Sequence, residues 1–194
     1  QMNQNPLPRL VTERLILRPF SSNDGPAVER LAGAREVADT TLTIPHPYPT
    51  GGGTEWIVTH ADAWERAREL TLAICAGTDG DILIGAISVQ FSLVHSHGEL
   101  GYWIGADHWG QGYATEAALA VLAFAFTTLA LHRIQARHFT RNPASGRVLL
   151  KLGLRLEGIH RDAFTRWNVF EDVAVYAILA TQWTPTARSS RRVI

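Results

Sequence analysis

The sequence predicts one domain with a mixed α/β fold, in which a largely antiparallel sheet also contains some parallel pairing. With 194 residues, 46% of them hydrophobic, the chain can bury a core of its own without disulfides or metal ions. Strand-like and helix-like runs follow one another without strict alternation, and neither an internal repeat nor a second domain is evident. We therefore assign residues 10–182 to a single domain and residues 183–194 to a flexible basic tail.

The N-terminal part of the chain carries patterns for one strand and two helices. Residues 13–18 ("ERLILR") alternate as a strand does, and the following "SSNDGPAVERLAGA" has capping candidates at Ser22 and Asp24 before a helix. Residues 43–53 ("TIPHPYPTGGG") hold three prolines and three glycines, which predicts a surface loop. Residues 54–69 place apolar side chains at helical spacing and predict the second helix.

The rest of the chain has patterns for six strands and two helices. Strands are predicted at 70–76 ("LTLAICA") and 81–93 ("DILIGAISVQFSL"), joined by the turn "GTDGD", and at 99–105 ("ELGYWIG"). The apolar run from Ala117 to Leu131 is too short to span a bilayer, so we expect a helix buried nearly all round. The remaining elements are a strand at 132–139, a helix at 142–152, and strands at 155–164 and 170–179.

Composition narrows the class of partner. Lys plus Arg equals Asp plus Glu at 18 each, so no overall charge draws the protein to nucleic acid or to an anionic membrane. The single Cys75 excludes a disulfide framework and predicts a buried structural thiol in a reducing compartment. No secretory signal is recognised before the fold, which favours a cytoplasmic location. The pair His95 and His97 lacks an evident third ligand, so we expect no metal site.

A glycine-rich turn precedes the apolar helix in "WGQGYATEA", residues 109–117. Such an entry leaves helix-end N–H groups uncovered where the helix dipole favours negative charge, so it predicts a phosphate site; the alternative is a tight turn that needs glycine. A P-loop is excluded because no Gly-Lys-Ser/Thr occurs, and a Rossmann fingerprint lacks its third glycine. The reading that remains is a diphosphate held by the N–H groups of Gly110, Gln111, Gly112, Tyr113, Ala114 and Thr115, with the Thr115 hydroxyl as an extra donor.

Five stretches spanning residues 12–179 resemble the GNAT superfamily of acyl-CoA-dependent N-acyltransferases, and within it the Rim-type group that acetylates the amino termini of ribosomal proteins. They are "TERLILRPF", "IPHPYPTGGGTEWI", "GELGYWIGADHWGQGYATEA", "NPASGRVLLKLGLRLEG" and "EDVAVYAIL". The resemblance implies the GNAT fold, a mostly antiparallel sheet of about seven strands with a central splayed parallel pair and about four helices. It also implies acetyl-CoA as co-substrate, no metal, and a primary amine as acceptor.

By this resemblance the acceptor is a protein N-terminal α-amine, such as that of a ribosomal protein, and the enzyme is a monomer or homodimer with no nucleic acid or membrane partner. Two alternatives stay open: a small-molecule amine as acceptor, or a non-catalytic module that binds acyl-CoA. The family's motif Gln/Arg-x-x-Gly-x-Gly/Ala falls on Trp109, Gly112 and Ala114. Trp109 departs from it, so grip on the diphosphate must rest more on backbone N–H groups and Thr115.

Further cofactor contacts follow from the same resemblance. The strand before the phosphate loop should splay from its neighbour, with Gly101 and Gly105 suiting the opening and the pantetheine arm bonding to exposed backbone. The residues expected to contact that arm are Trp103 and Ile104 through their backbone, Asn142, and Ser145 near the sulfur. From its sequence context alone, Asn142 is an ordinary helix N-cap candidate.

The catalytic residues predicted by resemblance are Glu99 and Ser145. Glu99 resembles the glutamate that histone-type relatives use as base; the alternative is a hairpin-end carboxylate in solvent. Leu149 stands where many relatives carry a tyrosine acid, so Ser145 becomes the expected hydrogen-bond donor to the leaving sulfur. Phe164 stands where some Rim-type relatives carry a carboxylate, which leaves Asp162 as a nearby alternative.

Acceptor recognition is predicted on two variable loops, because such loops carry specificity on a fixed scaffold. The first is the proline-rich loop with His46 and Tyr48, and the second is the hairpin around Phe164 and Trp167. The substrate-binding candidates are therefore Tyr48, Phe164 and Trp167, and an aromatic-lined mouth suits a peptide end and a hydrophobic small amine equally well.

Overall fold

A computed structural model describes residues 6–77, 79 and 82–185 of the chain, and a single twisted sheet runs through it. The strand order is β1-β2-β3-β4-β5-β6-β8-β7. The strands are β1 (Leu10–Val11), β2 (Leu15–Arg18), β3 (Glu69–Ala76), β4 (Ile82–Ser92), β5 (His97–Ile104), β6 (Arg133–Phe139), β7 (Arg155–Arg166) and β8 (Val169–Leu179). All neighbours are antiparallel except β5 and β6, which are parallel. The predicted mixed fold, with a mostly antiparallel sheet and one parallel pair, is confirmed.

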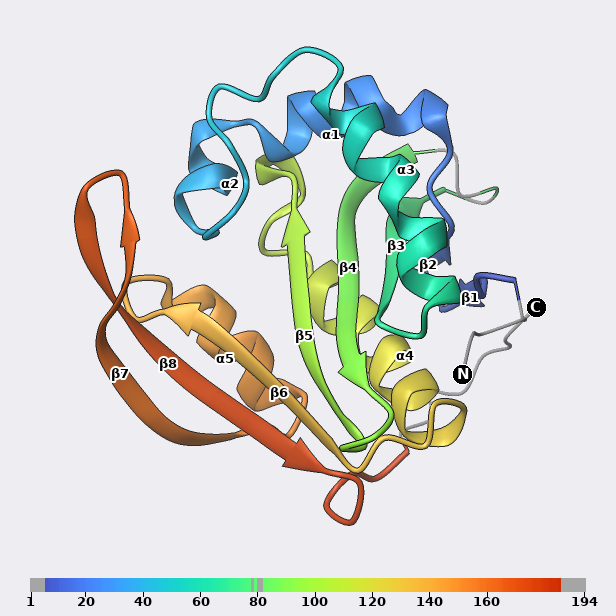
Figure 1. The fold of residues 1–194 in the computed structure, drawn as a ribbon, viewed down its shortest axis with the longest axis vertical. Coiled ribbons are helices and arrows are strands. Elements are labelled where there is room, and N and C mark those ends of the chain that lie inside the picture. The colour runs from blue at the N-terminus through green and yellow to red at the C-terminus, as the bar shows by residue number, and fades with distance from the viewer. Residues whose placement is uncertain (1–5, 78, 80–81, 186–194) are drawn as a thin grey trace.

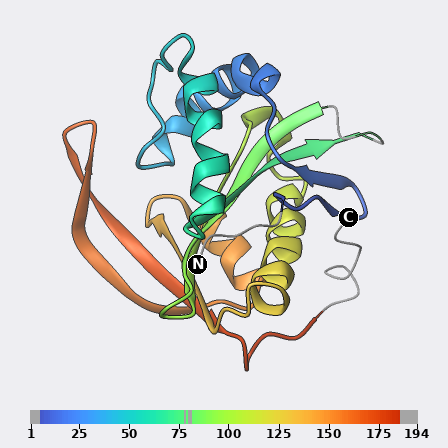
Figure 2. The same ribbon diagram turned by 45° about the vertical axis from the view of Figure 1, so that its right-hand side comes forward.

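Helices cover both faces of this sheet (Figures 1 and 2). They are α1 (Gly25–Ala32), α2 (Arg35–Asp39), α3 (Gly52–Glu65), α4 (Tyr113–Thr127) and α5 (Pro143–Lys151), with short 3-10 turns η1 (Ser22–Asp24) and η2 (Ala106–His108). Side chains of α1 and α3 form one buried cluster with β3, and those of α4 and α5 form a larger one on the other face. The sheet thus has a core on each side.

Two elements of the described chain escape the sequence analysis, namely β1 and α2. With two and five residues they are too short to show a period. Helix α3 also begins at Gly52, inside the predicted loop, because Gly53 packs on α1: a Cβ there would lie 2.3 Å from the carbonyl oxygen of Gly25. Residues 186–194 of the predicted tail, and residues 78, 80 and 81 of the predicted turn, lie outside the described residues.

The interior agrees with the apolar patterns of the sequence. Helix α4 buries alanine, valine, leucine and phenylalanine over most of its circumference, although it ends four residues earlier than its apolar run. Cys75 of β3 is fully buried. Among the residues that the structure describes, no helix combines the length and apolarity needed to cross a membrane.

One buried polar residue, His60 of α3, predicts an effect of pH on stability. Its ring packs against Phe20 and Trp56 at centroid distances of 5.4 and 4.4 Å, and neither ring nitrogen has a partner. Burial lowers the pKa of His60 to about 4. Between about pH 6.5 and 4 this histidine is therefore protonated in the unfolded chain but neutral in the folded chain. The free energy of unfolding decreases as the pH is lowered through that window.

Replacing His60 by phenylalanine should remove this effect. We expect the His60→Phe protein to lose less stability than the parent between pH 7.5 and 4.5, by at most about 3 kcal/mol in the free energy of unfolding. Urea unfolding at several pH values measures the difference. His160→Phe, at an exposed histidine of β7, is the control and should leave the pH dependence unchanged. Parallel pH profiles for the parent and His60→Phe would contradict the prediction.

Candidate active site

The glycine-rich segment connects β5 to α4 through two residues in the left-handed region, Gly110 (φ +74°) and Gly112 (φ +81°). Gly112 is the N-cap of α4 and no side chain caps the helix. The first N–H to bond back into the helix belongs to Glu116, which donates to the Gly112 carbonyl at 3.0 Å. Within the described chain, the N–H groups of residues 110–115 have no backbone or side-chain acceptor. Six donors thus gather at the positive end of the α4 dipole.

Arg14 contacts this loop although it lies 97 residues before Gln111 in the sequence. Its Nε lies 2.7 Å from a carboxylate oxygen of Glu116, another nitrogen donates to the Gln111 carbonyl at 3.0 Å, and the guanidinium sits 4.7 Å from the centre of the Tyr113 ring. Glu116 also accepts from the Thr12 hydroxyl at 2.6 Å and from the Arg14 N–H at 2.8 Å. Burial alone would raise the pKa of Glu116, but these hydrogen bonds outweigh it and lower that pKa. The carboxylate is a charged anchor under the loop.

Sequence reasoning missed Arg14, because the contact spans about a hundred residues and nothing local signals it. Lys151, at the end of α5, is the second cation that was missed. It borders two cavities, one of about 810 Å³ and a smaller one of about 600 Å³ beside Arg14 and Gln111. Gln111, predicted as a cofactor contact, lines only the smaller cavity. Its side-chain amide donates to the Asp107 carbonyl at 3.3 Å.

Trp109 ties the start of the glycine-rich loop to the end of β5. Its indole N–H donates to the carbonyl oxygen of Ile104 at 2.7 Å. The residue that departs from the family motif therefore contacts the protein's own backbone. As a result the Ile104 carbonyl, at the end of β5, is already engaged.

Strands β5 and β6 separate in front of this loop. They pair only over His97–Leu100 and Arg133–Ala136, and diverge beyond (Figure 1). The N–H of Gly105 donates to Ile84 of β4, so backbone groups of odd-numbered β5 residues face β4 and those of even-numbered residues face the gap. Tyr102 and Ile104 thus present backbone to the gap. The backbone groups of Trp103, which were predicted to meet the pantetheine arm, point to β4 instead.

A cavity of about 810 Å³ runs from the phosphate loop through this gap to the side of the sheet that carries α1 and α2. The predicted site residues that line it are Tyr48, Glu99, Trp103, Ile104, Gly110, Gly112, Tyr113, Ala114, Thr115, Asn142, Ser145 and Phe164. Two predicted residues, Gln111 and Trp167, are not brought into it. The structure therefore joins segments that are far apart in the sequence around one space.

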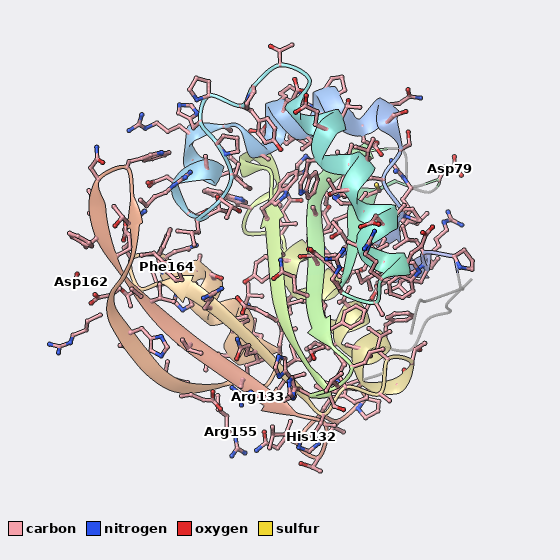
Figure 3. The ribbon with its side chains drawn as sticks, in the orientation of Figure 1. Asp79, His132, Arg133, Arg155, Asp162 and Phe164 are labelled. Carbon is pink, nitrogen blue, oxygen red and sulfur yellow. The ribbon has the colours of Figure 1, made fainter. Side chains whose placement is uncertain are left out.

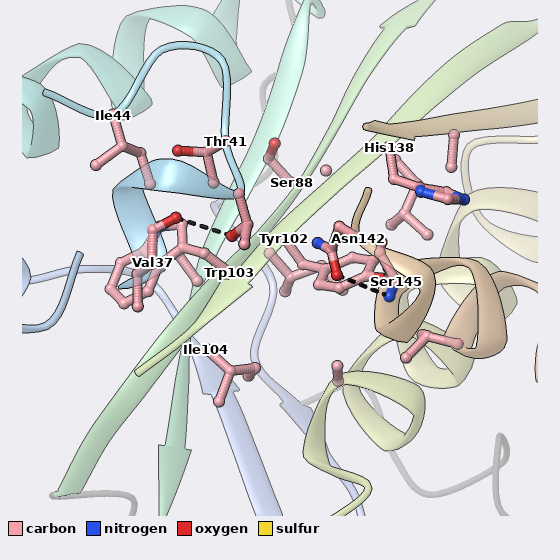
Figure 4. A pocket seen from close by; sticks show the side chains of 18 of the residues that line it. Val37, Thr41, Ile44, Ser88, Tyr102, Trp103, Ile104, His138, Asn142 and Ser145 are labelled. Atoms are coloured by element: carbon pink, nitrogen blue, oxygen red, sulfur yellow. Dashed lines mark hydrogen bonds between the residues drawn. The ribbon is translucent and has the colours of Figure 1, made fainter. Parts of the chain in front are cut away.

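Ser145 lies on the gap, held from two sides (Figure 4). The Asn142 side chain caps α5 by accepting from the Ser145 N–H at 3.4 Å, as an N-cap should. The Ser145 hydroxyl is 2.8 Å from the phenol oxygen of Tyr102. Burial raises the pKa of Tyr102 to about 12, so this phenol keeps its proton at neutral pH. Sequence reasoning did not single out Tyr102; strand alternation, which puts it on the α5 side, was the available signal.

Glu99 lies on the floor of the cavity, not at a solvated hairpin end. One of its oxygens is 2.6 Å from Nε of Arg137, and the other accepts from the Gln135 amide at 2.9 Å. In the sheet it stands opposite Gln90, which in turn stands opposite Glu69. The carboxylate is thus positioned by two neighbours on β6.

The end of the cavity away from the glycine-rich loop is lined by the loop after α2 and by the hairpin of β7 and β8, which we call the arm. Tyr48 lines the cavity. Burial, and to a smaller extent the negative charge of Glu29, raises the pKa of its phenol. Phe164 lines it from the arm (Figure 3), with the Arg137 guanidinium 5.1 Å from its ring centre. The Nδ1–H of His46 donates to the Gly33 carbonyl at 2.8 Å and so tethers the loop.

Two arm residues proposed from sequence lie elsewhere. The Trp167 ring packs on the guanidinium groups of Arg35 and Arg166 at 5.1 and 4.5 Å, outside the cavity, because its backbone turns at φ +48°. Asp162 also lies outside the lining; its own N–H donates to Asp172 at 2.8 Å. The arm therefore brings Phe164, but neither Trp167 nor Asp162, to the cavity.

Metal ligands are not assembled in the part of the chain that the structure describes. No group of three or more His, Cys, Asp or Glu side chains there could hold an ion. The rings of His95 and His97 stack at 5.8 Å in the turn before β5. His108 lines the cavity, 6.4 Å from the Tyr113 ring.

Comparison with known proteins agrees with this geometry. The model of the acetyltransferase (GNAT) domain matches residues 14–155. The uncharacterized N-acetyltransferase YoaA of Bacillus subtilis is 32% identical over 173 residues, covering 89% of this chain and 97% of YoaA. The [ribosomal protein uS5]-alanine N-acetyltransferase of Escherichia coli is 34% identical over 86 residues, 44% of each chain.

Solved structures give the same answer for the whole fold. The GNAT-family acetyltransferase of Bacillus anthracis superposes with a TM-score of 0.79 at 26% identity, covering 89% of this chain and 99% of that protein. GNAT acetyltransferases use acetyl-CoA, and the six unpartnered N–H groups at one end of the cavity fit its diphosphate. The chain belongs to the GNAT family of acetyltransferases.

Proposed function

We propose that this acetyltransferase acetylates a protein N-terminal α-amine. The observation that carries the transfer reaction is one continuous cavity that connects the unpartnered N–H groups of residues 110–115 with Glu99 through the gap between β5 and β6. A donor seated on the N–H groups would point its thioester at the gap, and an amine entering between the arm and α2 would meet it there.

The coenzyme half of the site is proposed from donors and cations. The N–H groups from Gly110 to Thr115 would hold the diphosphate, with Arg14 and Lys151 adding positive charge nearby. The free backbone groups of Tyr102 would bond the pantetheine arm together with Asn142, which leaves the N–H of Ile104 for the acetyl end of the coenzyme.

Proton handling in the proposed reaction falls to three side chains. Acetyl-CoA supplies the acetyl group as a thioester. An α-amine has a pKa near ~8, so roughly a tenth is already neutral at pH 7 and the base has modest work. Glu99 would accept the amine proton through a water molecule, and the Ile104 N–H would donate to the carbonyl oxygen. Ser145 would donate a hydrogen bond to the leaving sulfur, the Tyr102 phenol 2.8 Å away would donate in turn to the Ser145 hydroxyl, and the released thiolate would take its proton from solvent.

The pairing of Ser145 with Tyr102 gives a testable result. Ser145→Ala and Tyr102→Phe should each lower kcat by about tenfold, because general-acid help of this kind is worth at least that much. The double variant should be no worse than the poorer single variant, since the two groups act in one chain. Steady-state rates with saturating acetyl-CoA measure this. Multiplicative losses in the double variant would contradict a shared role.

The choice of acceptor rests on the similarity to ribosomal-protein acetyltransferases such as the uS5-alanine enzyme. A ribosomal acceptor would place the reaction in the cytoplasm. Release of free thiol from acetyl-CoA, followed with peptides that have free N-termini and with polyamines, amino acids and aminoglycosides, tests the proposal. Turnover on peptides alone supports it, turnover on small amines alone replaces the acceptor class, and tight binding of acetyl-CoA without release indicates a non-catalytic module.

A further inference from the structure

The acceptor wall of the cavity contains a segment without regular structure. Residues 40–45, which follow α2, line the cavity but form neither helix nor strand. Backbone carbonyls in such a segment need partners from elsewhere to hold one conformation. The question is which group supplies them.

Arg166, the last residue of β7, donates to three carbonyl oxygens of this region. Its guanidinium reaches Ala38 at 2.7 Å, Leu42 at 3.1 Å and Ile44 at 2.5 Å. The following residue, Trp167, covers the same guanidinium with its ring at 4.5 Å. A planar fork with several fixed donors suits three carbonyls at different angles, which a lysine ammonium would match less well.

A second arginine clamps the helix in front of this segment. Arg141 forms hydrogen bonds with both carboxylate oxygens of Asp39 at 2.9 and 3.2 Å and with the Asp39 carbonyl at 2.8 Å. The same side chain bonds Glu171 of β8 at 2.8 and 2.9 Å. The end of α2 is therefore tied to the arm twice, although more than 100 residues separate them in the sequence.

The coenzyme half of the cavity is built without these contacts. It is formed by β5, the phosphate loop, α4 and the start of α5, and no hydrogen bond of Arg166 reaches any of them. Loss of the Arg166 side chain should therefore disturb the acceptor wall and leave the coenzyme seat intact.

We propose that Arg166 is a positioning residue for the acceptor, which holds residues 40–45 as the wall against which the incoming amine is oriented. The inference rests on the proposed function, because it assigns this wall to the acceptor. It extends that function by making acceptor binding depend on the arm.

The test compares Arg166→Ala and Arg166→Lys with Arg161→Ala, an exposed arginine on the same strand that is absent from the cavity lining. The probes are acetyl-CoA and a hexapeptide with a free N-terminal alanine. We expect Arg166→Ala to raise the peptide KM by about tenfold or more, as loss of oriented hydrogen bonds does, with kcat changing less. The Kd of acetyl-CoA should stay within about twofold, and Arg166→Lys should be intermediate.

Amide hydrogen exchange of residues 40–44, the part of the segment that has amide hydrogens, separates this inference from the proposed function. Faster exchange in Arg166→Ala, with exchange in the phosphate loop unchanged, supports the wall even if no variant acetylates the peptide. Unchanged exchange at residues 40–44, an unchanged peptide KM, or equal losses for peptide and acetyl-CoA would each overturn it. Arg161→Ala should match the parent in every measurement.

Discussion

Gly110→Asp is expected to weaken acetyl-CoA binding by about 100-fold, the largest binding effect in this protein. The glycine has φ +74° and no atom lies within 4 Å of the position of a Cβ, so a side chain fits without a clash. Aspartate tolerates this backbone region better than most residues. Its carboxylate would lie beside the N–H groups meant for the diphosphate, and a like charge about 5 Å away costs about 3 kcal/mol at an effective dielectric of ~20.

Gly110→Asn is the matched control, because asparagine has the same shape and backbone tolerance without the charge. We expect it to change the Kd of acetyl-CoA by no more than about threefold. The difference between the two variants should shrink as salt is raised, since screening weakens repulsion at an exposed site. Isothermal titration at two salt concentrations measures both effects. Equal losses in the two variants would mean that the loop does not hold an anion.

Glu99→Gln is expected to lower kcat by about 100-fold while the Kd of acetyl-CoA stays unchanged. The amide keeps the size of the side chain but cannot accept the amine proton, and general-base help is typically worth about 10²–10⁴-fold. The loss should be smaller at pH 9 than at pH 7, because more of an α-amine with a pKa near ~8 is then already neutral. Initial rates across this pH range, at saturating acetyl-CoA, measure the effect.

The control for Glu99→Gln must account for its ion pair with Arg137. Glu157→Gln removes a similar ion pair. Glu157, on β7, bonds Arg133, which lies on β6 as Arg137 does, and neither Glu157 nor Arg133 lines the cavity. That variant should keep its rate within about twofold, since exposed ion pairs contribute little. If both variants lost activity equally, Glu99 would be a structural partner of Arg137 and not the base.

Much of the glycine-rich end of the cavity, where we propose that the coenzyme binds, could be predicted from the sequence because it depends on local backbone properties. Glycines at positions 110 and 112 adopt the left-handed conformation that few other residues tolerate, and the apolar run that follows becomes a buried helix. Asn142 caps α5 through its immediate neighbours. Each of these features is decided within a few residues, so a short stretch contains the whole signal.

The register of β5 shows where such reasoning ends. Gly101 and Gly105 indicate an opening near this strand, and the gap beside residues 101–104 agrees with it. Which backbone groups face the gap depends on whether the pairing with β4 starts on an odd or an even residue. If the register between β5 and β4 shifted by one residue, the backbone groups of Trp103 would face the gap in place of those of Tyr102. The pairing with β4 sets this register.

The sequence by itself determined the fold class, the glycine-rich loop and twelve of the residues that line the cavity, because glycine conformation, helix capping and apolar period are local. Only the tertiary structure decided the pairs that position them: Arg14 with Glu116, Tyr102 with Ser145, Glu99 with Arg137, and Arg166 with the loop after α2. The partners in these pairs are between 38 and 128 residues apart in the sequence, and the strand order of the sheet brings them together. Their geometry arises from packing, which no single stretch of the chain encodes.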